Sequence, residues 1–398
     1  MTQSTTQHID RLLEPIVRQR FFEGKVLVVY GARQVGKTTL ARQVLAHLPL
    51  PDAASAASAN VVSLNGDMPD TRLLLEDAAP ERIRALLEGK KILFIDEAQN
   101  IPAIGMILKR IADTMPDVQV LVTGSSSFDL ANRTSEPLTG RKIEYTLMPL
   151  SFQELKNATD LARERAKLER RLIFGAYPEI ATHEDDAAER LRTLAGSYLY
   201  KDVFALQAVR NPALLEKLLR ALALQCGSEV SYREVGQLVG LDGKTVERYV
   251  DVLCRSFVLF VLPAFSRNAR NELTRTRKIY FHDCGIRNAV IGNFLPLAQR
   301  TDTGALWENY LMSERYKWRL THAPDTRAYF WRTQAQAEVD LVEESAAGLS
   351  AYEFKWSERR TARIPAAFTT AYPNARVEII TRANYDMFLL EKTKNPQP

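Results

Sequence analysis

Three short apolar runs stand out in the first third of the chain. They are Val26 to Val29, Ile92 to Ile95 and Val118 to Val122, and each is followed by polar residues. Runs of this length that do not alternate with polar residues are typical of parallel strands buried on both faces. A helix is expected ahead of the first run, at Ile9 to Arg20, with Pro15 as a kink. Between the runs we expect helices at Leu40 to Leu45, Glu81 to Leu87 and Ile104 to Thr114, and a further strand at Val61 to Leu64. Alternating strands and helices predict an α/β fold with a doubly wound parallel sheet.

The pattern becomes helical after Phe152 and stays so to about Gln207. A different module follows, with expected helices at Leu214 to Leu224, Tyr232 to Val239 and Thr245 to Leu253, a turn at Gly240 to Gly243, and strands at Phe257 to Leu262 and Lys278 to Phe281. The short turn between the last two helices is helix-turn-helix spacing, and the two strands would form a wing. The pattern therefore predicts a winged helix.

The last part of the chain mixes one amphipathic stretch with alternating strands. The stretch is Ala305 to Trp318, and the strands are Phe330 to Arg332, Ala337 to Val342 and Ala351 to Lys355. Because side chains alternate between the two faces of a strand, Glu353 and Lys355 point to the same face. A second α/β domain is expected here.

Composition fits a multi-domain soluble enzyme of two to three domains. The 398 residues are 46% hydrophobic and 25% charged, and the net charge of +5 permits contact with nucleic acid without requiring it. The three cysteines have neither a paired framework nor zinc spacing, so they indicate reduced thiols in the cytoplasm. No apolar run approaches ~18 residues, so no membrane span is expected.

The first apolar run leads into the strongest motif of the chain. Gly31, Ala32, Arg33, Gln34, Val35, Gly36, Lys37, Thr38 and Thr39 match the phosphate-binding loop G-x-x-x-x-G-K-[ST]. Its backbone N–H groups would surround the phosphates of ATP at a helix N-terminus. Lys37 would reach the β- and γ-phosphates, and the Thr38 hydroxyl would hold Mg²⁺.

Two further strand ends complete the expected ATP site. Asp96 and Glu97 follow the second apolar run, where Asp96 would complete the Mg²⁺ shell and Glu97 would deprotonate the attacking water. The third run ends in Thr123-Gly124-Ser125. Either Thr123 or Ser125 could sense the γ-phosphate or the water, and a plain serine-rich loop is an equal alternative, because polar groups at neighbouring strand ends face the ligand crevice.

A basic strip accompanies the predicted winged helix. The candidate DNA contacts are Lys244 and Arg248 on the third helix and Arg267, Arg270, Arg275, Arg277 and Lys278 around the wing. Winged helices also serve as ATPase lids or subunit contacts, so that alternative stays open.

Several of these motifs resemble one group of bacterial and archaeal AAA-superfamily ATPases. The resemblance rests on Gly31 to Thr39, Phe94 to Gln99, Thr123 to Ser126, Gly140-Arg141, Pro149 to Phe152, Gly175 to Glu179 and Glu353 to Lys355. In that group the ATPase is fused to a C-terminal domain related to PD-(D/E)xK nucleases. The resemblance implies a homo-oligomer, for instance a hexamer, in which an arginine from a neighbouring subunit completes the ATP site. Arg141 and Arg133 are the candidates, and a structural role at the surface is an equal alternative for both.

The same resemblance implies a second metal site near the C-terminus. Asp340, followed after twelve residues by Glu353 and Lys355, resembles the catalytic hairpin of those nucleases. Asp340 and Glu353 would bind Mg²⁺ or Mn²⁺, Lys355 would position water, and Glu308 would add a ligand. Such a site could also be degenerate or serve binding alone.

These observations predict ATP hydrolysis coupled to DNA binding or remodelling. The expected domains are an N-terminal helix (1–20), an AAA-type ATPase core (21–155), a helical lid or linker (156–210), a winged helix (211–281) and a nuclease-like domain (282–398). The alternatives are a nucleotide-dependent regulatory or defence switch whose distal domains bind protein or nucleic acid without cleavage, and a scaffold.

Overall fold

A computed structural model describes residues 9–48, 60–76, 79–125, 138–198, 211–266, 277–357 and 363–390. The chain divides into two compact units. The N-terminal unit comprises Asp10–Met148 with Arg255–Phe257, and the C-terminal unit comprises the rest of the chain. The boundary after Met148 lies close to the predicted end of the ATPase core at residue 155, while the finer division of residues 156–398 stays a prediction.

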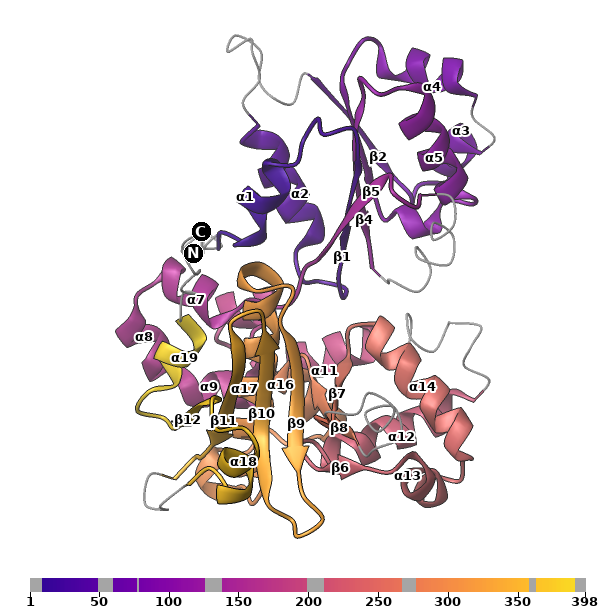
Figure 1. The fold of residues 1–398 in the computed structure, drawn as a ribbon. Helices are drawn as coiled ribbons and strands as arrows, with labels where there is room; N and C mark the ends of the chain where they lie inside the picture. The colour runs from indigo at the N-terminus through magenta and orange to yellow at the C-terminus, as the bar shows by residue number, and fades with distance from the viewer. Residues whose placement is uncertain are drawn as a thin grey trace. The chain divides into compact units, whose positions relative to one another are not determined.

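The N-terminal unit is built on a five-stranded parallel sheet (Figure 1). Its strand order is β2-β3-β4-β1-β5. The strands are β1 (Val26–Tyr30), β2 (Val61–Asn65), β3 (Ile92–Asp96), β4 (Gln119–Gly124) and β5 (Lys142–Thr146), and the helices are α1 (Leu13–Arg18), α2 (Lys37–Ala46), α3 (Pro69–Leu75), α4 (Pro80–Leu87), η2 (Ala98–Asn100) and α5 (Ile104–Thr114). The prediction of a parallel α/β sheet is confirmed.

The three apolar runs form the centre of this sheet. Every residue of β1, β3 and β4 is buried, whereas β2 and β5 at the two edges are partly exposed. The buried strands supply the main core together with apolar side chains of α4 and α5. Helix α1 is shorter than predicted, and Pro15 lies in its first turn, where its missing N–H has no helical partner to lose. Strand β5 was not predicted, because its residues are mostly polar.

The C-terminal unit contains two sheets and most of the helices. A three-stranded antiparallel sheet has the order β6-β8-β7, and a four-stranded sheet has the order β12-β11-β10-β9. The strands are β6 (Glu229–Val230), β7 (Leu259–Pro263), β8 (Arg277–Phe281), β9 (Arg327–Arg332), β10 (Glu338–Ser345), β11 (Gly348–Phe354) and β12 (Arg376–Ile380). Phe265 donates its N–H to the carbonyl of Phe330 at 2.6 Å, which links the chain after β7 to β9.

The helices of this unit cover both sheets. They are α7 (Phe152–Ala158), α8 (Leu161–Ala166), α9 (Leu168–Phe174), α10 (Pro178–Thr182), α11 (Ala187–Tyr198), α12 (Pro212–Leu224), α13 (Tyr232–Val239), α14 (Gly243–Arg255), α16 (Cys284–Ile291), η4 (Leu297–Gln299), α17 (Thr303–His322), α18 (Ala366–Ala371) and α19 (Tyr385–Leu390). The helices α12, α13 and α14 and the hairpin of β7 and β8 occur in the predicted order. The assignment of these elements as a winged helix stays a prediction.

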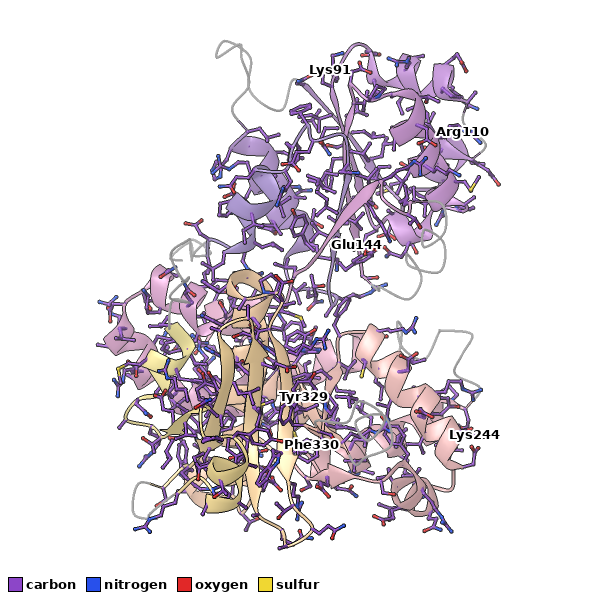
Figure 2. All side chains as sticks on the ribbon, in the orientation of Figure 1. Lys91, Arg110, Glu144, Lys244, Tyr329 and Phe330 are labelled. Carbon is purple, nitrogen blue, oxygen red and sulfur yellow. The ribbon has the colours of Figure 1, made fainter. Side chains whose placement is uncertain are left out.

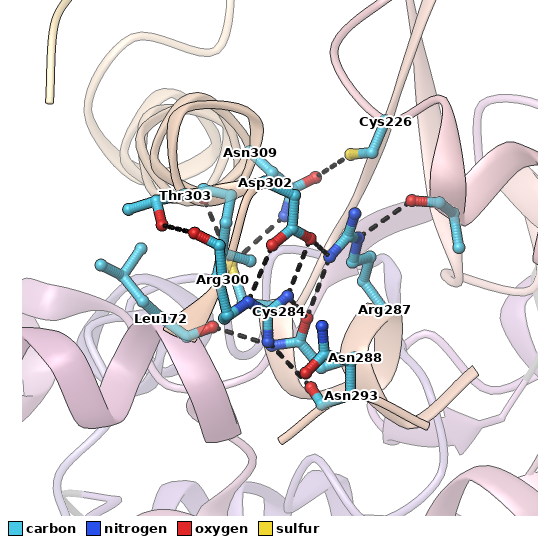
Figure 3. A network of polar contacts seen from close by, with 12 residues as sticks. Leu172, Cys226, Cys284, Arg287, Asn288, Asn293, Arg300, Asp302, Thr303 and Asn309 are labelled. Carbon is cyan, nitrogen blue, oxygen red and sulfur yellow. Dashed lines mark hydrogen bonds and ion pairs between the residues drawn. The ribbon is translucent and has the colours of Figure 1, made fainter. Parts of the chain in front are cut away.

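A buried polar network joins several of these helices (Figure 3). The Asn288 amide of α16 donates to the carbonyls of Leu172 (3.0 Å) and Ile173 (2.8 Å) at the end of α9. Arg287 donates to the Ala223 carbonyl of α12 at 2.9 Å and to Asp302 at 2.5 Å. Because these groups are buried and hydrogen-bonded, losing one partner would leave another unsatisfied. The network fixes how α9, α12 and α16 pack.

Within the described residues, no helix is both long enough and apolar enough to cross a membrane.

Candidate functional site

The phosphate-binding loop lies where the sequence predicts it, between β1 and α2. Gly36 caps α2 with a φ of 95°, and Gln34 also has a positive φ of 59°. At Gly31 the reason for glycine is close packing, since a Cβ there would lie 2.3 Å from the carbonyl oxygen of Leu147. The loop is therefore held between α2 and the chain that follows β5.

Lys37 is buried at the start of α2 and turns its ammonium into the loop. It donates to the carbonyls of Gly31 at 3.0 Å and Ala32 at 2.9 Å. A buried ammonium held beside the backbone amides of a helix N-terminus is a strong position for binding phosphate. Lys37, a predicted phosphate contact, is thus held inside the loop by two hydrogen bonds.

The ends of β1, β3 and β4 bring the other polar groups together. The Thr38 hydroxyl donates to Asp96 Oδ2 at 2.8 Å, and the Thr123 hydroxyl donates to Asp96 Oδ1. Strands β3, β4 and β1 are parallel neighbours, so their carboxyl ends share one edge of the sheet. A hydroxyl and a buried carboxylate form an oxygen donor set that fits Mg²⁺.

Glu97 is held beside this edge by a short chain of hydrogen bonds. Gln99 donates to Glu97 Oε2 at 2.5 Å and to the Ser125 hydroxyl at 3.0 Å, and the Ser125 N–H donates to Gln99 Oε1 at 3.3 Å. The Glu97 backbone has a φ of 50°, a conformation that non-glycine residues rarely adopt. Ser125 therefore reaches Glu97 through Gln99, a residue that was not predicted to have a role.

Arg11 is a second residue that sequence reasoning missed. It is buried and donates to the carbonyl of Val35 in the phosphate loop at 2.7 Å and to that of Met148 at 2.5 Å. No local pattern could indicate this role, because these partners lie 24 and 137 residues away. Arg11 holds the loop from outside its own motif.

Arg141 lies away from the phosphate loop of its own chain. It directly precedes β5, and its carbonyl accepts from the Val26 N–H at the start of β1, whereas the loop follows the end of β1. Its guanidinium donates to Asp113 and, at 3.4 Å, to the carbonyl of Thr139. Arg141 is therefore no part of its own ATP site, and a role in a neighbouring subunit's site stays a prediction. Arg133 lies outside the described residues.

Four residues of the predicted basic strip lie in the described part of the chain, and one of them is buried. Lys278 is buried with 2% of its side chain exposed, so the prediction that it lies on a surface for DNA is wrong. Arg277 lies 4.4 Å from the ring of Tyr232 and 3.7 Å from Glu247. Lys244 and Arg248 are exposed on α14, and Figure 2 labels Lys244 on the outer side of that helix. Arg267, Arg270 and Arg275 lie outside the described residues.

The predicted C-terminal metal ligands come together, but a lysine lies among them. The Lys278 ammonium is 3.0 Å from Glu308, 2.5 Å from Glu338 and 3.9 Å from Asp340. Burial alone would lower the pKa of Lys278, but the carboxylates Glu308, Asp340 and Glu338 outweigh it and raise the pKa. Burial, with the nearby charge of Glu308, raises the pKa of Asp340 well above its usual range.

Glu353 and Lys355 form a separate pair at this cluster. Lys355 donates to Glu353 Oε1 at 2.5 Å, and Asp340 accepts the Phe354 N–H at 2.7 Å. Among the described residues, no group of three or more acidic, histidine or cysteine side chains has a geometry that could hold a metal ion. With the Lys278 ammonium among them, the carboxylates of Glu308, Glu338 and Asp340 do not fit a divalent cation. Glu353 lies outside this set, and its Oε2 is buried without a hydrogen-bond partner among the described residues.

Three family descriptions match successive parts of the chain. An AAA domain matches residues 23–156, and two domains of unknown function, DUF8612 and DUF4143, match residues 165–296 and 303–394. The uncharacterized proteins Mb2031c of Mycobacterium bovis and Rv2008c of Mycobacterium tuberculosis are each 30% identical over 347 residues, which is 85% of this chain and 72% of theirs. Among solved structures, the Walker-type ATPase PABY2304 of Pyrococcus abyssi is 15% identical, with a TM-score of 0.49 over 71% of this chain and 96% of that one.

Proposed function

This chain belongs to the same family as the mycobacterial proteins Mb2031c and Rv2008c and carries an AAA-type ATPase domain, and on that premise we propose how its residues hydrolyse ATP. The reaction is attack of water on the γ-phosphate, in line with the leaving oxygen. Positioning of the reactants and stabilisation of charge supply most of the catalysis in such reactions. Each polar group at the sheet edge is therefore assigned one of these two tasks.

The phosphate loop and Lys37 bind the triphosphate. The loop's N–H groups and the N-terminus of α2 favour anions, and the ammonium of Lys37 is already buried beside the loop. Lys37 donates to two loop carbonyls, and in this proposal it exchanges these partners for phosphate oxygens when ATP binds. Only the Lys37 side chain has to move in this exchange, so the loop backbone is preorganised for the phosphates.

Thr38 and Asp96 would hold Mg²⁺, which when bound neutralises charge on the phosphates. Thr123 keeps Asp96 oriented, since its hydroxyl donates to the second carboxylate oxygen. Because Thr123 bonds one carboxylate oxygen and Thr38 the other, the Asp96 side chain is oriented toward Thr38 and the phosphate loop. Thr123 is accordingly a positioning residue.

Glu97 accepts the proton of the attacking water. Its carboxylate is oriented by Gln99, and Gln99 is anchored on Ser125 at the end of the neighbouring strand. Movement of the chain after β4 would therefore be transmitted to Glu97 through one amide side chain. In this proposal Lys37 and Glu97 are the catalytic residues, and Gln99 and Ser125 support Glu97.

The observation that carries the proposal is the meeting of Lys37, Thr38, Asp96 and Glu97 at one edge of the sheet. Lys37→Ala is expected to abolish tight ATP binding, because it removes the buried cation. Glu97→Gln is expected to keep ATP binding and lose turnover by ~100-fold or more, the usual effect of removing a general base. Nucleotide affinity and phosphate release measure the two steps, with Glu88→Gln, an exposed glutamate of the same unit, as the control. Equal turnover in wild type and Glu97→Gln would remove Glu97 from this role.

A second proposal, DNA contact by the C-terminal unit, is supported by Lys244 and Arg248. They are exposed and four residues apart on α14, so they lie on the same face of the helix that follows the tight turn. Two lost phosphate contacts would flatten the salt dependence of DNA binding by ~1.8 in log–log slope. The double variant Lys244→Ala/Arg248→Ala measures this, with Lys217→Ala as a control.

An unchanged slope would favour the alternative, a nucleotide-dependent switch whose distal domains bind protein. Metal-dependent cleavage of nucleic acid is left out of the proposal, because the carboxylates at Lys278 do not fit a divalent cation.

A further inference from the structure

The C-terminal unit contains a partly buried cluster of acidic side chains around a buried lysine. Glu308 comes from α17, and Glu338 and Asp340 come from β10. All three point toward the ammonium of Lys278 on β8, at 3.0, 2.5 and 3.9 Å. Carboxylates from separate elements that converge on one point would repel one another without a positive charge there.

Each member of this cluster is matched to a partner. Glu308 Oε1 also accepts from the Tyr280 hydroxyl at 2.6 Å, and Glu338 Oε2 lies 3.1 Å from Arg332. The aliphatic stem of Lys278 is buried too, with its ammonium 5.7 Å from the centre of the Phe330 ring. A charge buried with only 2% of its side chain exposed is stable when it is paired and hydrogen-bonded in this way.

We propose that Lys278 is the permanent cation of this acidic cluster and fills the place that a divalent metal would need. The ammonium lies among these carboxylates, so a divalent cation bound by the same groups would lie close to a second positive charge and be repelled by it. The cluster then serves to fasten β8 to α17 and β10 without any metal. By this inference the cluster joins these elements of the C-terminal unit without a metal.

The inference is independent of how the N-terminal unit hydrolyses ATP. In this proposal the acidic side chains hold β8 against α17 and β10 and take no part in catalysis. Lys278 belongs to β8, next to α12 to α14, while its partners belong to the four-stranded sheet and α17. A single buried ion cluster thus joins the two sheets of the unit, which a labile metal would do only while it stayed bound.

Mn²⁺ titration of the full chain without nucleotide, followed by the electron paramagnetic resonance signal of free Mn²⁺, tests the inference. Wild type is expected to show no binding that depends on Asp340, so wild type and Asp340→Asn give the same curve. Lys278→Ala leaves the acids without their cation and is expected to gain a site, with affinity raised about tenfold or more. The double variant Lys278→Ala/Glu308→Gln should lose that gain, and Lys217→Ala controls for loss of a surface lysine.

Every outcome decides the question. Mn²⁺ binding by wild type that weakens in Asp340→Asn would overturn the inference, because the metal and not Lys278 would then be the resident cation. A folded Lys278→Ala that gains no Mn²⁺ would overturn it as well. If Lys278→Ala does not fold, Lys278→Met keeps the stem against Phe330 and is read in the same way, and the comparison of wild type with Asp340→Asn does not need either variant.

Discussion

Burial of His282 makes the C-terminal unit less stable in mild acid. His282 follows β8 and is 3% exposed, with its ring 4.8 Å from Phe260 and 4.7 Å from Tyr316. Its Nδ1 is buried and has no hydrogen-bond partner among the described residues. Burial, and to a lesser degree the charge of Lys317, lowers the pKa of His282 to about 3.

The sign of the effect follows from this shift. Above pH 6.5, the ordinary pKa of histidine, His282 is neutral in both states and contributes nothing to the pH dependence. As the pH falls from 6.5 toward about 3, the unfolded chain takes up a proton that the folded chain refuses. The folded state therefore loses stability, by about 2 kcal/mol at pH 5 relative to pH 8.

The assay is urea denaturation followed by tryptophan fluorescence between pH 5 and pH 8. All four tryptophans, Trp307, Trp318, Trp331 and Trp356, belong to the C-terminal unit, so the signal reports that unit alone. In His282→Phe an aromatic ring stays between Phe260 and Tyr316, but the side chain at position 282 no longer titrates. Wild type should lose about 2 kcal/mol more than the variant across this range.

Comparing how the free energy of unfolding changes with pH in wild type and in His282→Phe isolates His282 from the other titrating groups. The pKa of the adjacent Asp283 is raised by burial, which acts in the opposite direction, but this carboxylate is present in both proteins and cancels. His183→Gln, which changes a partly exposed histidine of the same unit, is expected to follow wild type. Parallel curves for wild type and His282→Phe would refute the argument from burial.

Two further predictions concern buried arginines. Arg11→Ala should weaken ATP binding by about tenfold or more, because the carbonyl of Val35 loses a charged donor and the phosphate loop loses its anchor. Arg18→Ala, in α1 of the same unit, should leave binding unchanged, and a fluorescent nucleotide titration compares the two variants. Arg171→Met should cost about 3–5 kcal/mol in the tryptophan-detected unfolding, since Glu164 loses a buried bidentate partner at 2.7 and 3.0 Å, and adding Glu164→Gln should recover part of that loss. Equal destabilisation in the single and double variants would contradict the second prediction.

Much of the N-terminal unit could be predicted from the sequence. The apolar runs became β1, β3 and β4 with bounds within two residues, and the motif residues Lys37, Thr38, Asp96 and Glu97 lie at one sheet edge. The reason is that a doubly wound sheet always brings the carboxyl ends of its strands together. Once the strands are recognised, their polar ends must meet.

The sequence determined where the buried strands β1, β3 and β4 lie, because the spacing of apolar residues reflects which faces are buried within each short segment. The mostly polar β5 carried no such signal. The sequence also determined the phosphate loop, since that motif is a continuous segment whose glycines and lysine act locally. It could not determine that Arg11 holds Val35 and Met148, or that Lys278 turns away from the surface toward Glu308, Glu338 and Asp340. Those contacts join residues far apart in the chain, and only the packing of whole elements decides which long side chains are buried and what charges surround them.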